Sequence, residues 1–300
     1  MQSQILNDKH RREQIGFLLG TLGVVLFAGT LPFTRVALHG FSPSFITFGR
    51  AALATVCAIV TMLALRRPFP RAYWRELLAA GVLLGIAFPQ LMAIAMQTLP
   101  AAHGGVVLGI LPLMTATFAS LIDGDRPSPL FWFCAVAGGV LVILFATRDS
   151  GLHVSSGDLF LLAAAASCSL GYVFSGKLSR HMPGWEVISW ALIAISPISF
   201  IGATLTYEPR FMSASVPEIS SFAYLGLVSM YIGYFAWNIG LGMGGIARVG
   251  QVQLLQTFVT LAISALLLGE HVGWDTIIFA VAVAIMVAIG RRAPILKKAQ

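Results

Sequence analysis

The longest stretch of this chain without a charged residue decides the solvent in which it folds. From Leu77 to Ile122, 46 residues contain no Asp, Glu, Lys or Arg, and Pro100 lies near the middle. One helical crossing of a bilayer core about 30 Å thick needs ~20 mostly apolar residues. The stretch is therefore long enough for two crossings that reverse at Pro100, and we expect a polytopic membrane protein.

Composition and spacing predict one helical bundle. Hydrophobic residues make up 57% of the chain and charged residues 10%, whereas soluble domains carry ~25% charged residues. The apolar runs are continuous, which predicts helices, because strands of a barrel would alternate. Charge-free windows and turn residues predict ten spans: 14–37, 43–65, 74–98, 100–122, 127–147, 157–178, 184–206, 217–241, 245–268 and 273–290.

Basic residues give the expected orientation. With a cytoplasmic N-terminus, 15 of the 19 Lys and Arg residues lie on the cytoplasmic side, as the positive-inside rule requires. The exceptions are Arg35, Arg148 and Arg210 at the outer face and Arg50 within the second span. We therefore predict an even number of spans, with residues 1–13 and 291–300 as cytoplasmic tails.

The same distribution indicates which partners to expect. The net charge of +7 is divided among the ends of spans and forms no basic stripe with interleaved aromatic residues. Topology and attraction to anionic lipid headgroups explain it, so we expect membrane lipid but no nucleic acid as a partner. Cys57, Cys134 and Cys168 fall in predicted spans without metal-ligand spacing, and we expect no metal and no cofactor.

The two halves of the chain resemble each other. Residues 102–126 match residues 247–271 at a constant offset of 145, which pairs Gly105 with Gly250, Gly124 with Gly269, and Asp125 with Glu270. Residues 14–147 and 157–290 are thus expected to be two copies of a five-span unit. A unit with an odd number of crossings enters the membrane the second time upside down, which is the inverted-repeat architecture of transporters.

Several short motifs in the same order resemble a known family. A basic residue closes the first span of each half (Arg35, Lys177), FGRAAL occupies Phe48 to Leu53, and the fourth spans end in the turns Gly124-Asp125 and Gly269-Glu270. This pattern is similar to the EamA-type exporters of the drug/metabolite transporter superfamily over almost the whole chain. The resemblance implies an amino acid exporter of the bacterial inner membrane. Two halves in one chain also remove the need for a dimer, so we expect a monomer.

The sequence departs from internal symmetry at two places. The second half has Gln256 and Thr257 where the first has Leu111 and Pro112, and no basic residue near Ala191 corresponds to Arg50.

Acidic residues indicate the mode of transport. All twelve Asp and Glu residues fall in tails, loops or span ends. A site that binds cations or relays protons usually has a carboxylate at depth. Its absence favours facilitated transport of neutral or zwitterionic solutes over a carboxylate-driven proton antiporter.

Amide and aromatic residues within the spans are the candidate substrate-binding residues. Two or three amides can bond the carboxylate and ammonium of an amino acid, and rings can stack on its side chain. The alternatives are packing or an interfacial belt for the rings and interhelical hydrogen bonds for the amides. The candidates are Phe88, Gln90 and Gln97 in the third span, Ser169 and Tyr172 in the sixth, Tyr231, Tyr234, Trp237 and Asn238 in the eighth, and Gln253 and Gln256 in the ninth.

Three basic or titratable residues complete the set. His103 and Arg248 begin the fourth and ninth spans, where helix N-termini attract anions. We count His103 with the binding residues and Arg248 as a structural charge, the alternative being an interfacial His103 and a topogenic Arg248. Arg50 is expected to be a second structural charge that snorkels or pairs with a carbonyl or an acid.

Proline and glycine indicate where the spans bend. Pro32, Pro89, Pro112 and Pro197 interrupt spans and free carbonyl groups. We expect the third and fourth spans, and the eighth and ninth, to bend as gates. The expected hinge residues are Pro89, Gly104, Gly105, Gly242, Gly244 and Gly245.

The predicted function is export of aromatic and other neutral amino acids by alternating access. The alternative is a proton-coupled exporter of drugs or other metabolites. An intramembrane enzyme is disfavoured, because the spans contain no paired acids, no paired histidines, no Gly-x-Ser-x-Gly and no Gly-x-x-x-x-Gly-Lys.

Overall fold

The computed structural model is a bundle of helices. It describes residues 2–123, 126–147, 155–244, 252, 255–292 and 295–296. The first half contains α1 (Gln2–Ala28), α2 (Thr30–Gly40), α3 (Pro43–Ala64), α4 (Trp74–Gly81), α5 (Phe88–Ala95), α6 (Ala101–Val107), α7 (Leu111–Asp123) and α8 (Pro129–Thr147). The second half contains α9 (Ser156–Leu178), α10 (Gly184–Ala194), α11 (Ser196–Leu205), α12 (Val216–Ala223), α13 (Gly233–Gly244), α15 (Leu255–Leu268) and α16 (Trp274–Arg292).

Short elements of other geometry connect these helices. There are 3-10 turns at η1 (Arg71–Tyr73), η3 (Leu108–Ile110) and η4 (Pro209–Ser213), and π-helical segments at η2 (Val82–Ala87) and η5 (Tyr224–Ile232). The strands β1 (Arg126–Pro127) and β2 (Ile295–Leu296) form a two-residue antiparallel pair.

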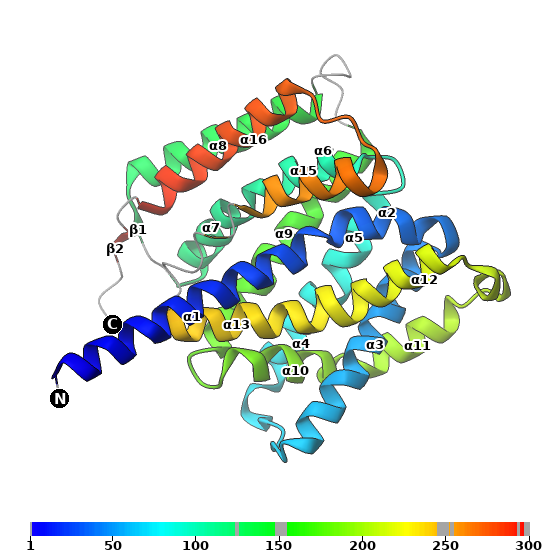
Figure 1. Cartoon of the computed structure of the whole chain (residues 1–300), viewed down its shortest axis with the longest axis horizontal. Coiled ribbons are helices and arrows are strands. Elements are labelled where there is room, and N and C mark those ends of the chain that lie inside the picture. The colour runs from blue at the N-terminus through cyan, green and yellow to red at the C-terminus, as the bar shows by residue number, and fades with distance from the viewer. Residues whose placement is uncertain are drawn as a thin grey trace.

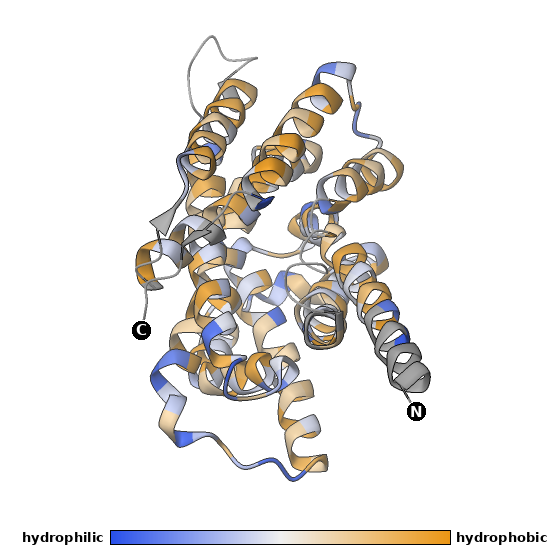
Figure 2. Cartoon of the chain, turned by 90° about the vertical axis from the view of Figure 1, so that its left-hand side faces the viewer, coloured by the Kyte–Doolittle hydropathy of each residue, from blue (hydrophilic) through white to orange (hydrophobic). Residues whose placement is uncertain are grey.

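The apolar helices are consistent with a membrane protein. Six continuous helical segments are long and apolar enough to cross a bilayer, and α10 with α11 forms a seventh that is bent by 51°. Three shorter apolar helices, 129–145, 255–268 and 274–290, make up the rest. Each segment overlaps one of the ranges expected from the sequence. Figure 2 shows that hydrophobic residues predominate along the helices.

Each proline expected to interrupt a span lies beside a change of helix geometry. Proline has no N–H and cannot bond the carbonyl four residues before it. Pro32 follows the break between α1 and α2, Pro89 follows η2, Pro112 follows η3, and Pro197 follows the bend at Ile195. The expected interruption at Pro197 is confirmed by the 51° bend, whereas at Pro32, Pro89 and Pro112 the helical segment changes geometry but continues.

A hydroxyl group from another segment bonds a carbonyl near each of these interruptions. Thr260 Oγ1 donates to Ala28 O at 2.9 Å, Ser167 Oγ to Leu83 O at 3.0 Å, Ser169 Oγ to Leu111 O at 3.4 Å and Thr55 Oγ1 to Leu192 O at 3.2 Å. Unsatisfied carbonyls cost several kcal/mol in hydrocarbon, so these bonds stabilise the irregular segments and tie them to their neighbours.

The helix pairs repeat under exchange of the two halves. The first segment packs on the eighth (α1 on α13), and the sixth packs on the third (α9 on α4 and α5). The contact of α3 in the first half with η5 corresponds to that of α10 in the second half with α4. In the same way, the contact of α7 with α9 corresponds to that of α15 with α1. The pairs α3 with α11, α6 with α15, and α8 with α16 join equivalent segments (Figure 1). The helix contacts of one half are thus similar to those of the other when the two halves are exchanged.

The long contact between α1 and α13 depends on glycine. A Cβ atom on Gly240 would lie 2.6 Å from the backbone nitrogen of Gly20 and 2.8 Å from the carbonyl oxygen of Gly16. A Cβ atom on Gly23 would lie 2.9 Å from the backbone nitrogen of Trp237. Small residues allow this close approach, and dispersion contacts then hold the helices together in lipid.

We predict opposite effects for alanine at two glycines. Gly240→Ala should destabilise the protein by about 1–3 kcal/mol, because α1 and α13 must separate to admit the methyl group. Gly176→Ala in α9 is the control: a Cβ atom there meets nothing within 4 Å, and replacing a helical glycine should be neutral or stabilising. Thermal unfolding of the purified variants measures both. Equal unfolding temperatures would contradict the close packing of α1 on α13.

Candidate substrate cavity and closed end

A cavity lies where the two halves meet. It encloses about 530 Å³ of non-atom space, including its opening. Its walls come from the α1–α2 break, α3, η2, α5, η3, α7, α9, η5, α13 and α15. Its polar and aromatic lining residues are Phe27, Thr30, Arg50, Phe88, Cys168, Tyr172, Ser229, Tyr234, Gln256 and Thr260.

Four aromatic rings line the cavity. The rings of Phe27 and Tyr234 meet edge to face, with centroids 4.8 Å apart. Tyr172 contacts Cys168 and the hydroxyl group of Tyr234, and Phe88 adds a fourth ring. Such a wall can accept an aromatic or aliphatic side chain by stacking and dispersion.

Hydroxyl and amide groups also line the cavity. Thr30 Oγ1 and Ser229 Oγ lie 2.7 Å apart and join α2 to η5. Gln256 and Thr260 also line a second, smaller cavity between α15 and the η3 region. These groups can exchange hydrogen bonds with a polar solute without carrying charge themselves.

Arg50 is the charged residue among those that line the cavity. Its side chain is 3% exposed, and Nη2 donates to Ser229 Oγ at 3.3 Å. Nε and Nη1 have no hydrogen-bond partner among the described residues. The expectation that Arg50 pairs with a carbonyl or an acid is therefore not met in this part of the chain.

The cavity brings together four of the predicted binding residues: Phe88, Tyr172, Tyr234 and Gln256. They come from four different segments, which a linear sequence keeps far apart. Phe27, Thr30, Arg50 and Ser229 line the same cavity and were not among the predicted binding residues. The sequence did mark Arg50 as unusual, because a charge within a span is uncommon. Small hydroxyl residues and single phenylalanines are common in spans, so nothing in the sequence marked Thr30, Ser229 or Phe27 as binding residues.

The other predicted binding residues make contacts outside this cavity. Gln90 Nε2 donates to Ser44 Oγ at 3.2 Å, Ser189 and Tyr231 hydroxyls lie 3.3 Å apart, and Asn238 Nδ2 donates to Gly184 O at 2.8 Å. Ser169 bonds Leu111 O, and Trp237 is buried against Phe27. Gln97 is exposed beyond the end of α5. Gln253 lies outside the described residues.

The expected hinge residues lie in two regions. Pro89 is at the start of α5 directly after η2, and Gly104 and Gly105 are in α6 before η3. Gly242 and Gly244 belong to the last turns of α13. Gly245 and Arg248 fall outside the described residues.

Glu270 links the second half to the first at one end of the bundle. Its two carboxylate oxygens accept from the backbone N–H groups of Ala101 at 2.8 Å and Ala102 at 2.7 Å, at the start of α6. Arg35 lies 3.9 Å from the same carboxylate and also donates to the carbonyl of Leu99. A carboxylate at a helix N-terminus satisfies free donors and complements the helix dipole.

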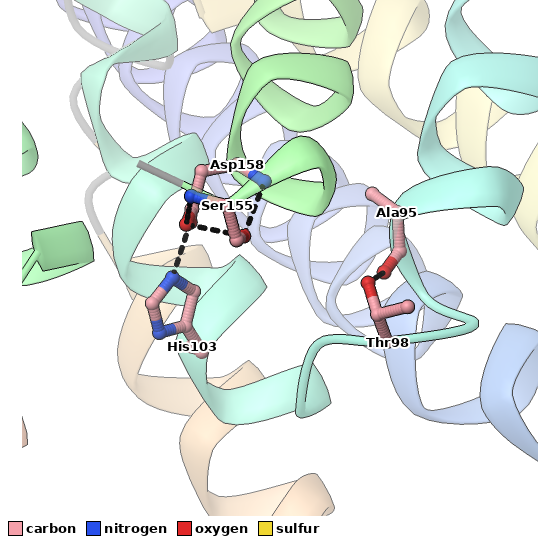
Figure 3. Close-up of polar contacts among 5 residues, drawn as sticks. All are labelled: Ala95, Thr98, His103, Ser155 and Asp158. Carbon is pink, nitrogen blue, oxygen red and sulfur yellow. Dashed lines mark hydrogen bonds and ion pairs between the residues drawn. The ribbon is translucent and has the colours of Figure 1, made fainter. Parts of the chain in front are cut away.

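His103 makes a second link at the same helix. Its Nε2 lies 2.7 Å from Asp158 Oδ1 (Figure 3). Asp158 also forms a capping box on α9: its backbone N–H donates to Ser155 Oγ at 3.1 Å, and its Oδ2 accepts from the backbone N–H of Ser155 at 3.2 Å. The His103 ring packs on Phe145 with centroids 4.8 Å apart. His103 therefore lies at the end of the bundle, away from the residues that line the cavity.

The chain is similar to several known transporters. It is 42% identical over 283 residues to "Uncharacterized transporter YdeK" of Bacillus subtilis, covering 92% of this chain and 97% of that protein. It is 30% identical to a "Probable amino-acid metabolite efflux pump" of Salmonella typhimurium (85% and 87% covered). It is also 20% identical to the "Aromatic amino acid exporter YddG" of Escherichia coli (86% and 90% covered).

A solved structure supports the fold. The chain superposes with a TM-score of 0.61 on a protein titled "Crystal structure of protein", which is 22% identical and is matched over 91% of this chain and 95% of that one. The family model for EamA-like transporters matches twice, at residues 14–147 and 155–289. The chain therefore belongs to the EamA-like transporter family of the drug/metabolite transporter superfamily, as its sequence motifs indicate.

Proposed function

We propose that this protein exports aromatic and other neutral amino acids across a bacterial inner membrane. The observation that carries the proposal is the cavity between the halves, which is lined by both aromatic rings and hydroxyl and amide groups. Two relatives with "amino-acid metabolite efflux" and "aromatic amino acid exporter" in their names support the substrate class.

Alternating access is the proposed mechanism. The helix contacts repeat under exchange of the halves, and the family model matches each half separately. Two inverted copies of one unit would have two conformations of similar energy, each opening the shared cavity to a different side. Both termini are proposed to be cytoplasmic, as the distribution of basic residues indicates.

We propose that transport is facilitated by the substrate gradient. The described residues that line the cavity include no Asp or Glu, so they offer no carboxylate to carry a proton with the substrate. This arrangement disfavours the proton-coupled alternative.

The contacts of Glu270 and His103 are proposed to close the outer end. In the predicted topology the start of α6, the end of α2 and the turn after α15 that contains Glu270 all face outward. Glu270 and Arg35 come from opposite halves of the chain, as do His103 and Asp158. Opening this end would separate these charged pairs, so the proposed state of this conformation is closed to the outside.

Exchange in liposomes tests the substrate class. Vesicles that contain the purified protein and unlabelled phenylalanine should take up labelled phenylalanine without a pH gradient. Tyr234→Ala should reduce this exchange about ten-fold or more, because a stacking wall of the cavity is lost. Tyr207→Ala is the control, since Tyr207 is 47% exposed and packs on Phe45 and Phe211.

Two results would contradict the proposal. Uptake that requires a pH gradient would show proton coupling, and exchange that is equally reduced by both substitutions would show that Tyr234 acts through general stability.

Substitution of Glu270 tests the closed end. Glu270→Gln should lower the unfolding free energy by about 1–3 kcal/mol, because an amide nitrogen would replace one of the two oxygens that accept from α6. Glu208→Gln is the matched control: Glu208 is 43% exposed and pairs with the 67% exposed Arg210, and exposed pairs contribute little. Thermal unfolding compares them. If Glu270→Gln unfolds at the same temperature as Glu208→Gln, the carboxylate does not hold this end together.

A further inference from the structure

We propose that Arg50 binds the carboxylate group of the transported solute within the cavity. The inference rests on the proposed transport function and deepens it, because it names the group that recognises the substrate and the chemical class it selects. Solutes with a carboxylate, whether zwitterionic or anionic, should bind, and solutes that carry only an ammonium group should be excluded.

The position of Arg50 places its charge inside the membrane. Arg50 is the eighth residue of α3, which begins at Pro43 and ends at Ala64, so it lies roughly 10 Å along the helix axis from the start. The side chain is 3% exposed. A guanidinium remains protonated in proteins, so this is a buried positive charge.

The charge is only partly satisfied by the protein. Nη2 donates to Ser229 Oγ, whose oxygen lies 2.7 Å from Thr30 Oγ1. Nε and Nη1 carry three of the five guanidinium N–H groups, and nothing in the described part of the chain accepts from them. An uncompensated charge in a membrane is costly and points to a partner that is bound in function.

No described Asp or Glu side chain is bonded to Arg50. The hydroxyls of Tyr224 and Tyr234 are titratable groups in its surroundings. Within the described residues, the ion pairs of Glu186, Glu208 and Glu270 are with Arg67, Arg210 and Arg35, and Asp158 pairs with His103. In this proposal the solute supplies the anion that the described residues do not.

The cavity supplies the access and the remaining contacts. Arg50 lines the same cavity as Tyr172, Tyr234 and Gln256. A carboxylate can accept two parallel N–H bonds from a guanidinium. The ammonium group of a zwitterion would then face rings and uncharged acceptors, which offer cation–π and hydrogen-bonding contacts. A cation without a carboxylate would meet an unscreened positive charge.

Three small molecules separate these possibilities: phenylalanine, 3-phenylpropionate, which lacks the ammonium group, and phenethylamine, which lacks the carboxylate. Ligand-induced thermal stabilisation of the purified full-length protein reports their binding. The wild type should be stabilised by the first two and not by phenethylamine. Arg50→Gln should raise the half-saturating concentration of 3-phenylpropionate about ten- to a hundred-fold, as expected for loss of a charged hydrogen-bond pair.

Two further variants control for structural effects. Arg50→Lys keeps a positive charge but loses the planar fork, so it should fold and show an intermediate loss of carboxylate binding even if Arg50→Gln does not fold. Arg210→Gln removes an exposed guanidinium and should bind as the wild type does. If the only role of Arg50 were to hold Ser229 in place, substitutions of Arg50 would weaken the binding of every ligand to the same extent, or would weaken the binding of none.

The proposal is overturned if 3-phenylpropionate binds Arg50→Gln or Arg50→Lys as tightly as the wild type. It is also overturned if no carboxylate stabilises the wild type, or if phenethylamine stabilises it equally well. Phenylalanine exchange in liposomes separates the two claims. If carboxylates bind in an Arg50-dependent way but phenylalanine is not exchanged, the binding site is supported and amino acid export is rejected. If phenylalanine is exchanged and its half-saturating concentration is unchanged in Arg50→Gln, export is supported and the binding site at Arg50 is rejected.

Discussion

The need to satisfy backbone groups inside hydrocarbon shapes the whole structure. Prolines leave carbonyl groups without their usual N–H partner, and lipid cannot bond them. The Thr260 hydroxyl meets this need at Ala28 O, four residues before Pro32, and the hydroxyls of Ser167 and Thr55 add bonds to Leu83 O and Leu192 O. The segments that change geometry beside the cavity are therefore also joined by hydrogen bonds to the other half of the chain.

The arrangement of charge divides the molecule into two kinds of region. At one end, carboxylates are paired and hydrogen-bonded: Glu270 with the start of α6, and Asp158 with His103. In the middle, a guanidinium faces rings and hydroxyls without a described carboxylate partner. The described carboxylates at this end are thus bonded, while the cavity contains an arginine that has no described carboxylate partner. This difference is what the proposed binding of a solute carboxylate depends on.

Much of the architecture follows from the sequence because its physical causes are local. Apolar length predicted where helices lie, and the missing N–H of Pro32, Pro89, Pro112 and Pro197 predicted where their geometry changes. The predicted binding faces were less accurate for a specific reason. The periodicity of an α-helix placed Tyr231 and Tyr234 on one face, but Tyr231 lies within η5, where i→i+5 bonds add a residue to the turn. Tyr234 lies beyond it and lines the cavity, while Tyr231 contacts Ser189.

Gln97 illustrates a second cause. Its seven-residue spacing from Gln90 implied a common helical face, but α5 ends at Ala95 and Gln97 lies in the turn that follows. Arg50 shows the opposite case, where the residue was recognised as unusual but its surroundings could not be foreseen. Whether a buried arginine meets an acid depends on which helices pack against α3, and that is a property of the tertiary structure.

The π-helical segments η2 and η5 occupy equivalent places in the two halves, and each ends next to a residue that lines the cavity. Phe88 follows η2 directly, and Tyr234 follows η5 after one glycine. A π turn holds one surplus residue, so its conversion to an α turn would swivel everything beyond it by about 100°. Phe88 and Tyr234 therefore lie where a change from π to α geometry in spans three and eight would reorient an aromatic ring of the cavity.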